Sequence, residues 1–211
     1  MSTKLLVLGA TGGTGLEVVR QALEAGHDVT AYVRNPAKLT MKSDRLRVQA
    51  GGAIDSVDGL RAAMRGQDAV ITALGNGNSL KSHGLFARST PVIVRAMESV
   101  GIRRLVVCSA FGVGETWRDT PLIGRLVIRV LLRDLYADKE IADALLRRCG
   151  LDWTIVYPTS LANGPRTGLY RVGERLALRG NPKISRADVA DFMLKQVTDN
   201  AFVRKGVLVS Y

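Results

Sequence analysis

Short runs of apolar residues alternate along this chain with longer segments whose apolar residues recur at helical spacing. Such alternation is typical of a parallel sheet that is covered by helices on both faces. We therefore expect an α/β fold with about seven strands. The expected strands cover residues 4–8, 28–33, 46–50, 68–74, 103–109, 152–157 and 206–210.

Three of the expected helices end at a glycine, the residue that most readily adopts the left-handed conformation of a helix C-cap. Pro91 lies within the third helix, where it either kinks the helix or serves as a first-turn proline behind Thr90. The three helices cover residues 13–25, 56–65 and 85–100, and the glycines are Gly26, Gly66 and Gly101.

Two longer segments interrupt the alternation of strands and helices. Residues 111–121 follow the fifth expected strand, and residues 158–182 form a mostly irregular excursion before the last helix. In an open parallel sheet, ligands bind beyond the carboxyl ends of the strands. Because both segments leave such ends, we expect them to wall a substrate cleft.

A glycine-rich turn joins the first strand to the first helix. Gly9 permits the tight turn, Gly12 lets a phosphate approach the backbone, and Gly15 lets the helix pack closely on the strand. The N-terminus of the helix favours an anion, so the turn is a candidate dinucleotide site. A glycine hairpin is the alternative, but helical spacing continues after the turn. We expect one domain, residues 1–211, with a single Rossmann-type, doubly wound parallel sheet.

The second strand ends at Arg34, where an NAD-binding chain presents an acidic residue to the adenosine ribose. A guanidinium can bind the 2′-phosphate of NADP(H), and Lys38 lies close enough along the chain to add a second cation. The expected cofactor is therefore NADP(H). An arginine with no role beyond the surface is the alternative, because the chain has many.

The chain carries 30 Lys and Arg against 19 Asp and Glu, a net charge of +11. A basic chain raises nucleic acid as a partner, but the arginines are dispersed and not interleaved with aromatic residues, which argues against it. Arg125, Arg129 and Arg133 form a stripe that we interpret as the solvated face of an amphipathic helix.

Few features of the chain point to a membrane, a disulfide or a metal. No apolar run is long enough to span a membrane, and no signal peptide is apparent, so we expect a cytoplasmic protein without a membrane partner. Cys108 and Cys149 lie in apolar settings typical of buried thiols. Ligand spacing for a metal is absent, and no metal site is expected. We expect a monomer or a small homo-oligomer.

Five blocks of sequence resemble the atypical short-chain dehydrogenases/reductases of the NAD(P)H-binding, NmrA-like type, and most closely the flavin reductase/biliverdin reductase B group. They are GATGGTGLEVVRQALEAGHDVTAYVRNPAKL, GQDAVITALG, VVCSAF, LLRRCGLDWTIVYP and ISRADVADFML. The first and fourth are the more specific to this superfamily.

The resemblance implies a role for each matching position. It places the pyrophosphate on Gly9, Thr11, Gly12, Gly13 and Thr14, and the 2′-phosphate on Arg34 and Lys38. Leu74 and Gly75 would flank the adenosine ribose and the diphosphate. Ser109, Ala110 and Phe111 would line the nicotinamide on one side, with Tyr157, Pro158 and Thr159 on the other.

The chain departs from the family pattern in two places. The first departure affects the contact to the adenine ring, and the second affects proton transfer. Relatives commonly carry Gly-Asp after the third strand, with the Asp bonded to the adenine amino group, but here the pair is Gly51-Gly52. Short-chain dehydrogenases that reduce carbonyls use Tyr-x-x-x-Lys, which sets a phenol beside an ammonium. Lys139 is present, but Leu135 takes the tyrosine position and Tyr136 comes one place late.

A proton relay of the usual kind is therefore not expected, although Lys139 can still bond the nicotinamide ribose. The candidate catalytic residues are Ser109, Lys139 and Tyr136; structural roles for the last two are the alternative. We expect an NADPH-dependent reductase of a planar small molecule, such as a flavin, quinone or tetrapyrrole-like compound. The alternative is a non-catalytic NADP(H) sensor of the NmrA-like type, and a nucleotide-sugar epimerase is disfavoured.

Overall fold

The first apolar run forms the strand β1 (Lys4–Leu8), whose side chains alternate between two apolar cores. Leu5 and Val7 belong to one core, and Leu6 and Leu8 belong to the other. Because both faces of the strand are buried, the run is continuously apolar instead of alternating with polar residues. It thus lies inside the sheet.

A computed structural model describes residues 2–52, 54, 56–77, 79–178 and 180–211. The strands after β1 are β2 (Asp28–Val33), β3 (Leu46–Ala50), β4 (Ala69–Thr72), β5 (Arg104–Cys108), β6 (Asp152–Pro158), β7 (Ser160–Ala162), β8 (Arg171–Gly173), β9 (Lys183–Ser185) and β10 (Lys205–Ser210). The helices are α1 (Gly13–Glu24), α2 (Val57–Met64), α3 (Leu85–Val100), α4 (Leu122–Leu131), α5 (Arg133–Arg148) and α6 (Arg186–Lys195), with short 3-10 helices η1 (Pro36–Lys38) and η2 (Gly114–Asp119).

Within these described residues, eight strands form one sheet in the order β3-β2-β1-β4-β5-β6-β10-β8. All neighbouring pairs are parallel except β10 and β8, which are antiparallel. The chain runs outward from β1 in both directions, so the strand order reverses between β1 and β4. In folds of this kind, the ligand site lies beyond the carboxyl ends of the strands at this reversal.

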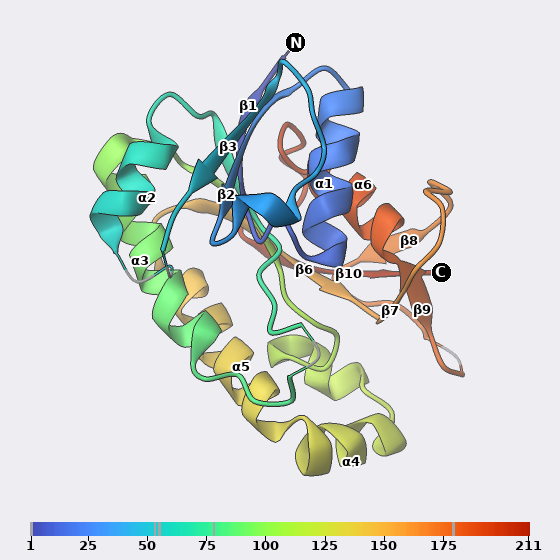
Figure 1. Cartoon of the computed structure of the whole chain (residues 1–211). Coiled ribbons are helices and arrows are strands. Elements are labelled where there is room, and N and C mark those ends of the chain that lie inside the picture. The colour runs from blue at the N-terminus through green and yellow to red at the C-terminus, as the bar shows by residue number, and fades with distance from the viewer. Residues whose placement is uncertain (1, 53, 55, 78, 179) are drawn as a thin grey trace.

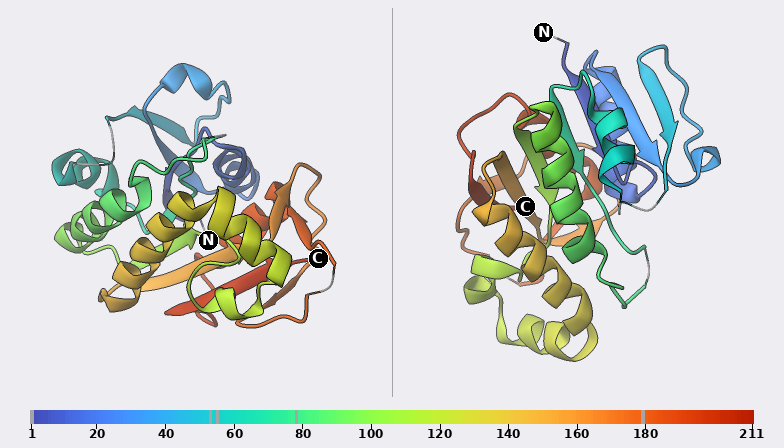
Figure 2. Two further views of the ribbon diagram at one scale, coloured as in Figure 1. Left: turned by 90° about the horizontal axis from the view of Figure 1, so that it is seen from below. Right: turned by 90° about the vertical axis from the view of Figure 1, so that its left-hand side faces the viewer.

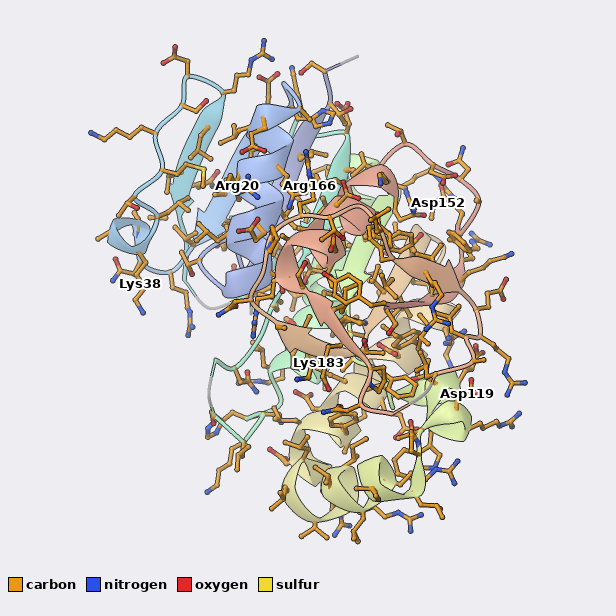
Figure 3. The ribbon with its side chains drawn as sticks, turned by 90° about the vertical axis from the view of Figure 1, so that its right-hand side faces the viewer. Arg20, Lys38, Asp119, Asp152, Arg166 and Lys183 are labelled. Carbon is orange, nitrogen blue, oxygen red and sulfur yellow. The ribbon has the colours of Figure 1, made fainter. Side chains whose placement is uncertain are left out.

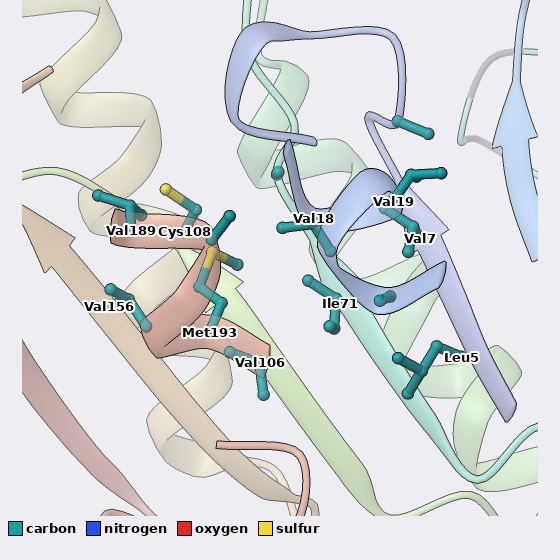
Figure 4. Packing of buried hydrophobic residues seen from close by; sticks show 14 of the residues in the cluster. Leu5, Val7, Val18, Val19, Ile71, Val106, Cys108, Val156, Val189 and Met193 are labelled. Carbon is teal, nitrogen blue, oxygen red and sulfur yellow. The ribbon is translucent and has the colours of Figure 1, made fainter. Parts of the chain in front are cut away.

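Helices cover both faces of the sheet (Figure 1). α1 and α6 pack against each other on one face, and α2, α3 and α5 lie on the other, with α3 packed against both neighbours (Figure 2). Val18 and Val19 of α1 meet Val7 and Ile71 of the sheet in the first core (Figure 4). This arrangement confirms the doubly wound, Rossmann-type fold.

The structure corrects several details of the expected element pattern. The sheet has eight strands, because residues 171–173 add the antiparallel edge strand β8. The excursion over 158–182 also contains β7, which pairs with β9, and the loop over 111–121 contains η2. Pro91 lies in the interior of α3, so the first-turn alternative is wrong.

Each of the three expected terminal glycines has positive φ, as a left-handed C-cap requires. The values are +79° for Gly26, +74° for Gly66 and +77° for Gly101. The arginine stripe, in contrast, spans two helices, because α4 ends at Leu131 and α5 begins at Arg133.

Candidate cofactor and active site

In the glycine turn after β1, backbone contacts leave no room for a side chain at Gly9 or at Gly15. Gly9 has φ of +82°, and a Cβ there would lie 2.5 Å from the carbonyl oxygen of Ala73. A Cβ on Gly15 would overlap the carbonyl oxygen of Gly9. These contacts match the tight turn and the close helix packing expected for the two positions.

The start of α1 offers backbone N–H groups beside this turn. The N–H of Gly12 donates to the carbonyl of Gly9 over 3.0 Å, and the helical ladder begins where Leu16 donates to Gly12 over 2.8 Å. The N–H groups of Gly13 and Thr14 therefore precede the first helical bond and have no acceptor within the helix. With the positive end of the helix dipole, they fit a pyrophosphate.

A cation that the sequence did not reveal lies over the same turn. Arg186 is the first residue of α6, and a Cβ on Gly13 would come within 2.8 Å of its Cδ atom. Its Nη1 atom donates to Oδ1 of Asn163 over 2.8 Å. Arg186 belongs to the block ISRADVADFML but had no expected role, because it reaches Gly13 only through the packing of α6 against α1.

Arg34 and Lys38 both lie exposed at the carboxyl end of β2. Lys38 ends the short helix η1, and Figure 3 shows its side chain on that turn, away from the body of the sheet. Within the described residues, neither side chain forms an ion pair. The two cations are thus open to a phosphate from solvent.

Gly51 and Gly52, which follow β3, differ in how much space surrounds them. A Cβ on Gly51 would overlap the ring of Tyr32, which is buried beneath it. Gly52 is exposed, and no heavy atom lies within 4 Å of the place where its Cβ would sit. Crowding therefore does not exclude an Asp side chain at position 52.

Ser109, Ala110 and Phe111 follow β5 at the same edge of the sheet as Leu74 and Gly75, which follow β4. Two backbone bonds tie this segment to β6. The N–H of Ser109 donates to the carbonyl of Val156 over 2.8 Å, and that of Phe111 donates to Pro158 over 3.0 Å. The structure thus brings the segment directly beside Pro158.

The side chains of Tyr157 and Thr159 point away from this edge. Tyr157 is 1 % exposed, and its hydroxyl donates to Asp143 over 2.8 Å. The Thr159 hydroxyl donates to Oγ of Ser210 over 3.1 Å and is buried as well. A cofactor contact by these two residues would therefore have to use their backbone.

Tyr136 and Lys139 of α5 lie next to the segment after β5. The Tyr136 hydroxyl donates to the carbonyl of Phe111 over 3.1 Å, and burial raises its pKa. The Lys139 ammonium lies 3.8 Å from the centre of the Phe86 ring. Burial lowers the pKa of Lys139, whereas Cys108 and the carboxylates of Asp143 and Asp138 oppose this shift.

Asp143 is a second residue that the sequence analysis missed. Its Oδ1 atom accepts from the Ser109 hydroxyl over 3.2 Å, and its Oδ2 atom accepts from Tyr157. Burial raises the pKa of Asp143 to about 6, although the bonds from Tyr157 and Ser109 and the charges of Lys139 and Arg147 oppose the shift. Its spacing offered a signal, because Asp143 follows Lys139 by four residues on one helix face.

A small cavity of about 20 Å³ lies behind Ser109, between α3, α5 and the sheet. Polar and apolar groups share its lining, including Thr72, Phe86, Ser89, Lys139 and Asp143. A volume of this size holds about one water molecule. The cavity is therefore too small for an aromatic ring system.

The two cysteines are both free thiols. Cys108 is buried, and burial raises its pKa, while Cys149 is only half-buried, contrary to expectation. No helix in the described part of the chain has the length and apolar character needed to cross a membrane.

Comparisons with known proteins place this site in a family. Residues 9–200 match the NAD(P)H-binding family. The chain is 27 % identical to an uncharacterized sugar epimerase, YhfK, of Bacillus subtilis, over 93 % of this chain and 88 % of the relative. It is 23 % identical to the reductase pytE of Aspergillus terreus, over 96 % of each chain.

A solved structure shows the same fold. ChuY of Escherichia coli, described as an anaerobillin reductase, superimposes with a TM-score of 0.80 and 23 % identity, covering 98 % of this chain and 96 % of that one. The match over residues 9–200 includes the glycine turn and the strands β2 to β6. The chain therefore belongs to the NAD(P)H-binding family.

Proposed function

We propose that this chain is an NADPH-dependent reductase that passes hydride to a planar acceptor such as a flavin, quinone or tetrapyrrole-like compound. The observation that carries the proposal is the hydrogen bond from Tyr136 to the carbonyl of Phe111. In this bond the Tyr136 hydroxyl donates to a backbone carbonyl, so it does not donate to a substrate bound beside Lys139. Acceptors that take hydride without a strong adjacent acid fit such a site best.

The preference for NADPH is supported by the charge around the end of β2. Arg34 and Lys38 are exposed there, where an acidic residue would repel a 2′-phosphate. The pyrophosphate would be held by the glycine turn, the start of α1 and the guanidinium of Arg186. When bound, the cofactor supplies a hydride from its nicotinamide ring.

The other residues of the site position groups and limit water. Ser109 would orient the carboxamide or the acceptor, and its hydroxyl is itself fixed by Asp143. Lys139 would bond the nicotinamide ribose. Hydride transfer then depends mainly on how the nicotinamide ring and the acceptor ring are placed against each other. The segment after β5, which is hydrogen-bonded to β6, would support this placement.

This assignment makes the chain an atypical short-chain dehydrogenase/reductase of the NmrA-like type, near the flavin reductase/biliverdin reductase B group. The name of the relative pytE supports a reductase. The name of YhfK points to an epimerase. Nucleotide-sugar epimerases rely on the tyrosine that is replaced here by Leu135, which favours the reductase.

A non-catalytic NADP(H) sensor is the second candidate. The engaged Tyr136 favours it as well, because a sensor has no need of a proton relay. Two variants separate the alternatives within the site. If the protein is a reductase, Tyr136→Phe should retain NADPH oxidation with FMN or a quinone within about threefold, whereas Ser109→Ala should lower kcat by about tenfold or more. A large loss of kcat in Tyr136→Phe, with NADPH binding unchanged, would show that Tyr136 takes part in catalysis and would contradict this proposal.

A further inference from the structure

The helix α4 carries its apolar side chains on the outside of the protein. Six of them, which we call the α4 apolar face, are between 41 % and 80 % exposed. Ile128 is the buried residue of the helix. The α4 apolar face consists of Leu122, Ile123, Leu126, Val127, Val130 and Leu131. An ordinary surface helix turns such a stripe toward the core, so this orientation needs an explanation.

Cations line one side of this face, and no carboxylate belongs to the helix. The guanidinium groups of Arg125 and Arg129 lie 5.5 Å from the centre of the Trp117 ring. The sequence of α4 contains no Asp or Glu. Of the nearest acids along the chain, Asp119 pairs with Arg175 over 2.6 Å, and Asp134 belongs to α5, where it accepts from the N–H of Ser82 over 2.5 Å. The positive charge beside the apolar face is thus not neutralised by the helix itself.

We propose that the α4 apolar face docks on an anionic lipid bilayer. A helix with strongly segregated apolar and basic sides lies in the bilayer interface, with leucine and isoleucine among the acyl chains and arginine among the headgroups. A second copy of the chain fits less well. Two α4 helices packed face to face would bring two rows of arginine together without a carboxylate from either helix. The net charge of +11 also favours an anionic surface.

Docking through α4 would orient the whole molecule. Figure 1 shows α4 beyond the carboxyl ends of the strands. The glycine turn follows β1 and Ser109 follows β5, so both lie at these carboxyl ends. The bilayer would therefore face the edge that carries the candidate site, within reach of an acceptor dissolved in lipid. This last consequence rests on the proposed function, whereas the docking itself does not.

Vesicle flotation of the full chain tests the proposal without cofactor or acceptor. The protein should float with vesicles of phosphatidylcholine and phosphatidylglycerol, and about tenfold less with phosphatidylcholine alone. Leu126→Glu should lower binding to the anionic vesicles by about tenfold. Leu169→Glu is the matched control, because Leu169 is an exposed leucine outside α4 (82 %) and its loss should change binding by less than about twofold. Circular dichroism checks that both variants are folded.

A second pair of variants tests the role of charge. Arg129→Gln should weaken binding to the anionic vesicles, and Arg129→Lys should restore it. Two results would overturn the proposal: no flotation of the wild-type chain with anionic vesicles, or equal losses in Leu126→Glu and Leu169→Glu. A lipid-free dimer that sedimentation shows to be lost in Leu126→Glu would assign the face to a second copy instead. A failure to oxidise NADPH would leave these outcomes unchanged and would count only against the proposed function.

Discussion

The hydroxyl of Ser109 donates a hydrogen bond to Asp143 over 3.2 Å, and so joins the carboxyl end of β5 to the buried side of α5. The same carboxyl group accepts from Tyr157 of β6 over 2.8 Å. One aspartate therefore fixes side chains from two neighbouring strands. Its protonation state bears on both the stability of the fold and the geometry of the candidate site.

The raised pKa of Asp143 predicts a pH-dependent contribution to folding. The ordinary value is 3.8, and burial raises the pKa to about 6 in the folded protein. Because the folded state binds this proton more tightly than the unfolded state, its stabilising effect is complete below the unfolded pKa and is lost as pH rises through about 6. Relative to Asp143→Asn, the wild-type free energy of unfolding should fall by about 2 kcal/mol between about pH 4 and about pH 7 in urea titrations.

Asp152 provides a control with the opposite sign. The hydrogen bond from Arg103 lowers the pKa of this surface carboxyl. Its stabilising effect is therefore present above the unfolded pKa and is lost as pH falls through the folded one. Relative to Asp152→Asn, the wild-type chain should gain stability as pH rises. The same slope for both aspartates would contradict the assignment of Asp143.

Two glycines of the first turn should respond differently to alanine. A Cβ on Gly15 would overlap the Gly9 carbonyl, so Gly15→Ala should destabilise the fold by about 3 kcal/mol or more. A Cβ on Gly12 would lie 3.4 Å from that oxygen, and φ there is −80°, which alanine adopts freely. Gly12→Ala should therefore fold normally but weaken NADPH binding at least about tenfold, by blocking the pyrophosphate. Thermal unfolding and isothermal titration measure the two effects.

Arg34→Ala should separate the two nicotinamide cofactors. Loss of the guanidinium at the end of β2 should weaken NADPH binding by about 1.5–3 kcal/mol and NADH binding little. Arg65→Ala is a suitable control, because Arg65 is an exposed arginine between the end of α2 and the start of β4, whereas Arg34 follows the carboxyl end of β2. Equal losses for NADPH and NADH in titrations of Arg34→Ala would remove the argument for a 2′-phosphate site.

Gly52→Asp should supply the adenine contact that the family resemblance implies for this position. The position is exposed with open space around its missing Cβ, so the substitution should leave stability nearly unchanged. A carboxylate there would accept from the adenine amino group and tighten NADPH binding by about fivefold. Gly51→Ala is the contrasting variant, because its Cβ would overlap the ring of Tyr32 and should destabilise the protein. Weaker NADPH binding by Gly52→Asp would show that the adenine lies elsewhere.

Local patterns were enough to predict the parallel part of the sheet and the turn after β1. The continuous apolar run from Leu5 to Leu8 and the glycine-rich segment directly after it are local features of the sequence, although the carbonyl that crowds Gly9 belongs to the distant Ala73. The edge strand β8 escaped prediction because it has three residues and forms only through pairing with β10. Short elements of this kind depend on a distant partner and leave little periodicity.

Site residues were harder to predict where their contacts cross the fold. Arg186 reaches Gly13 because α6 packs on α1, and nothing beside either residue reveals this contact. The outward apolar face of α4 was likewise hidden, since a helical wheel shows amphipathicity but not which side meets the protein. Tyr136 shows the same limit, because its bond to Phe111 depends on how α5 sits beneath the segment after β5.

The central claim is tested most directly by measuring NADPH binding and NADPH oxidation on the same preparation, with FMN, FAD and a series of quinones as acceptors. NADPH should bind more tightly than NADH and should be oxidised under steady-state turnover by at least one of these planar compounds. Tight NADPH binding without turnover on any acceptor would contradict the reductase assignment and would favour the sensor.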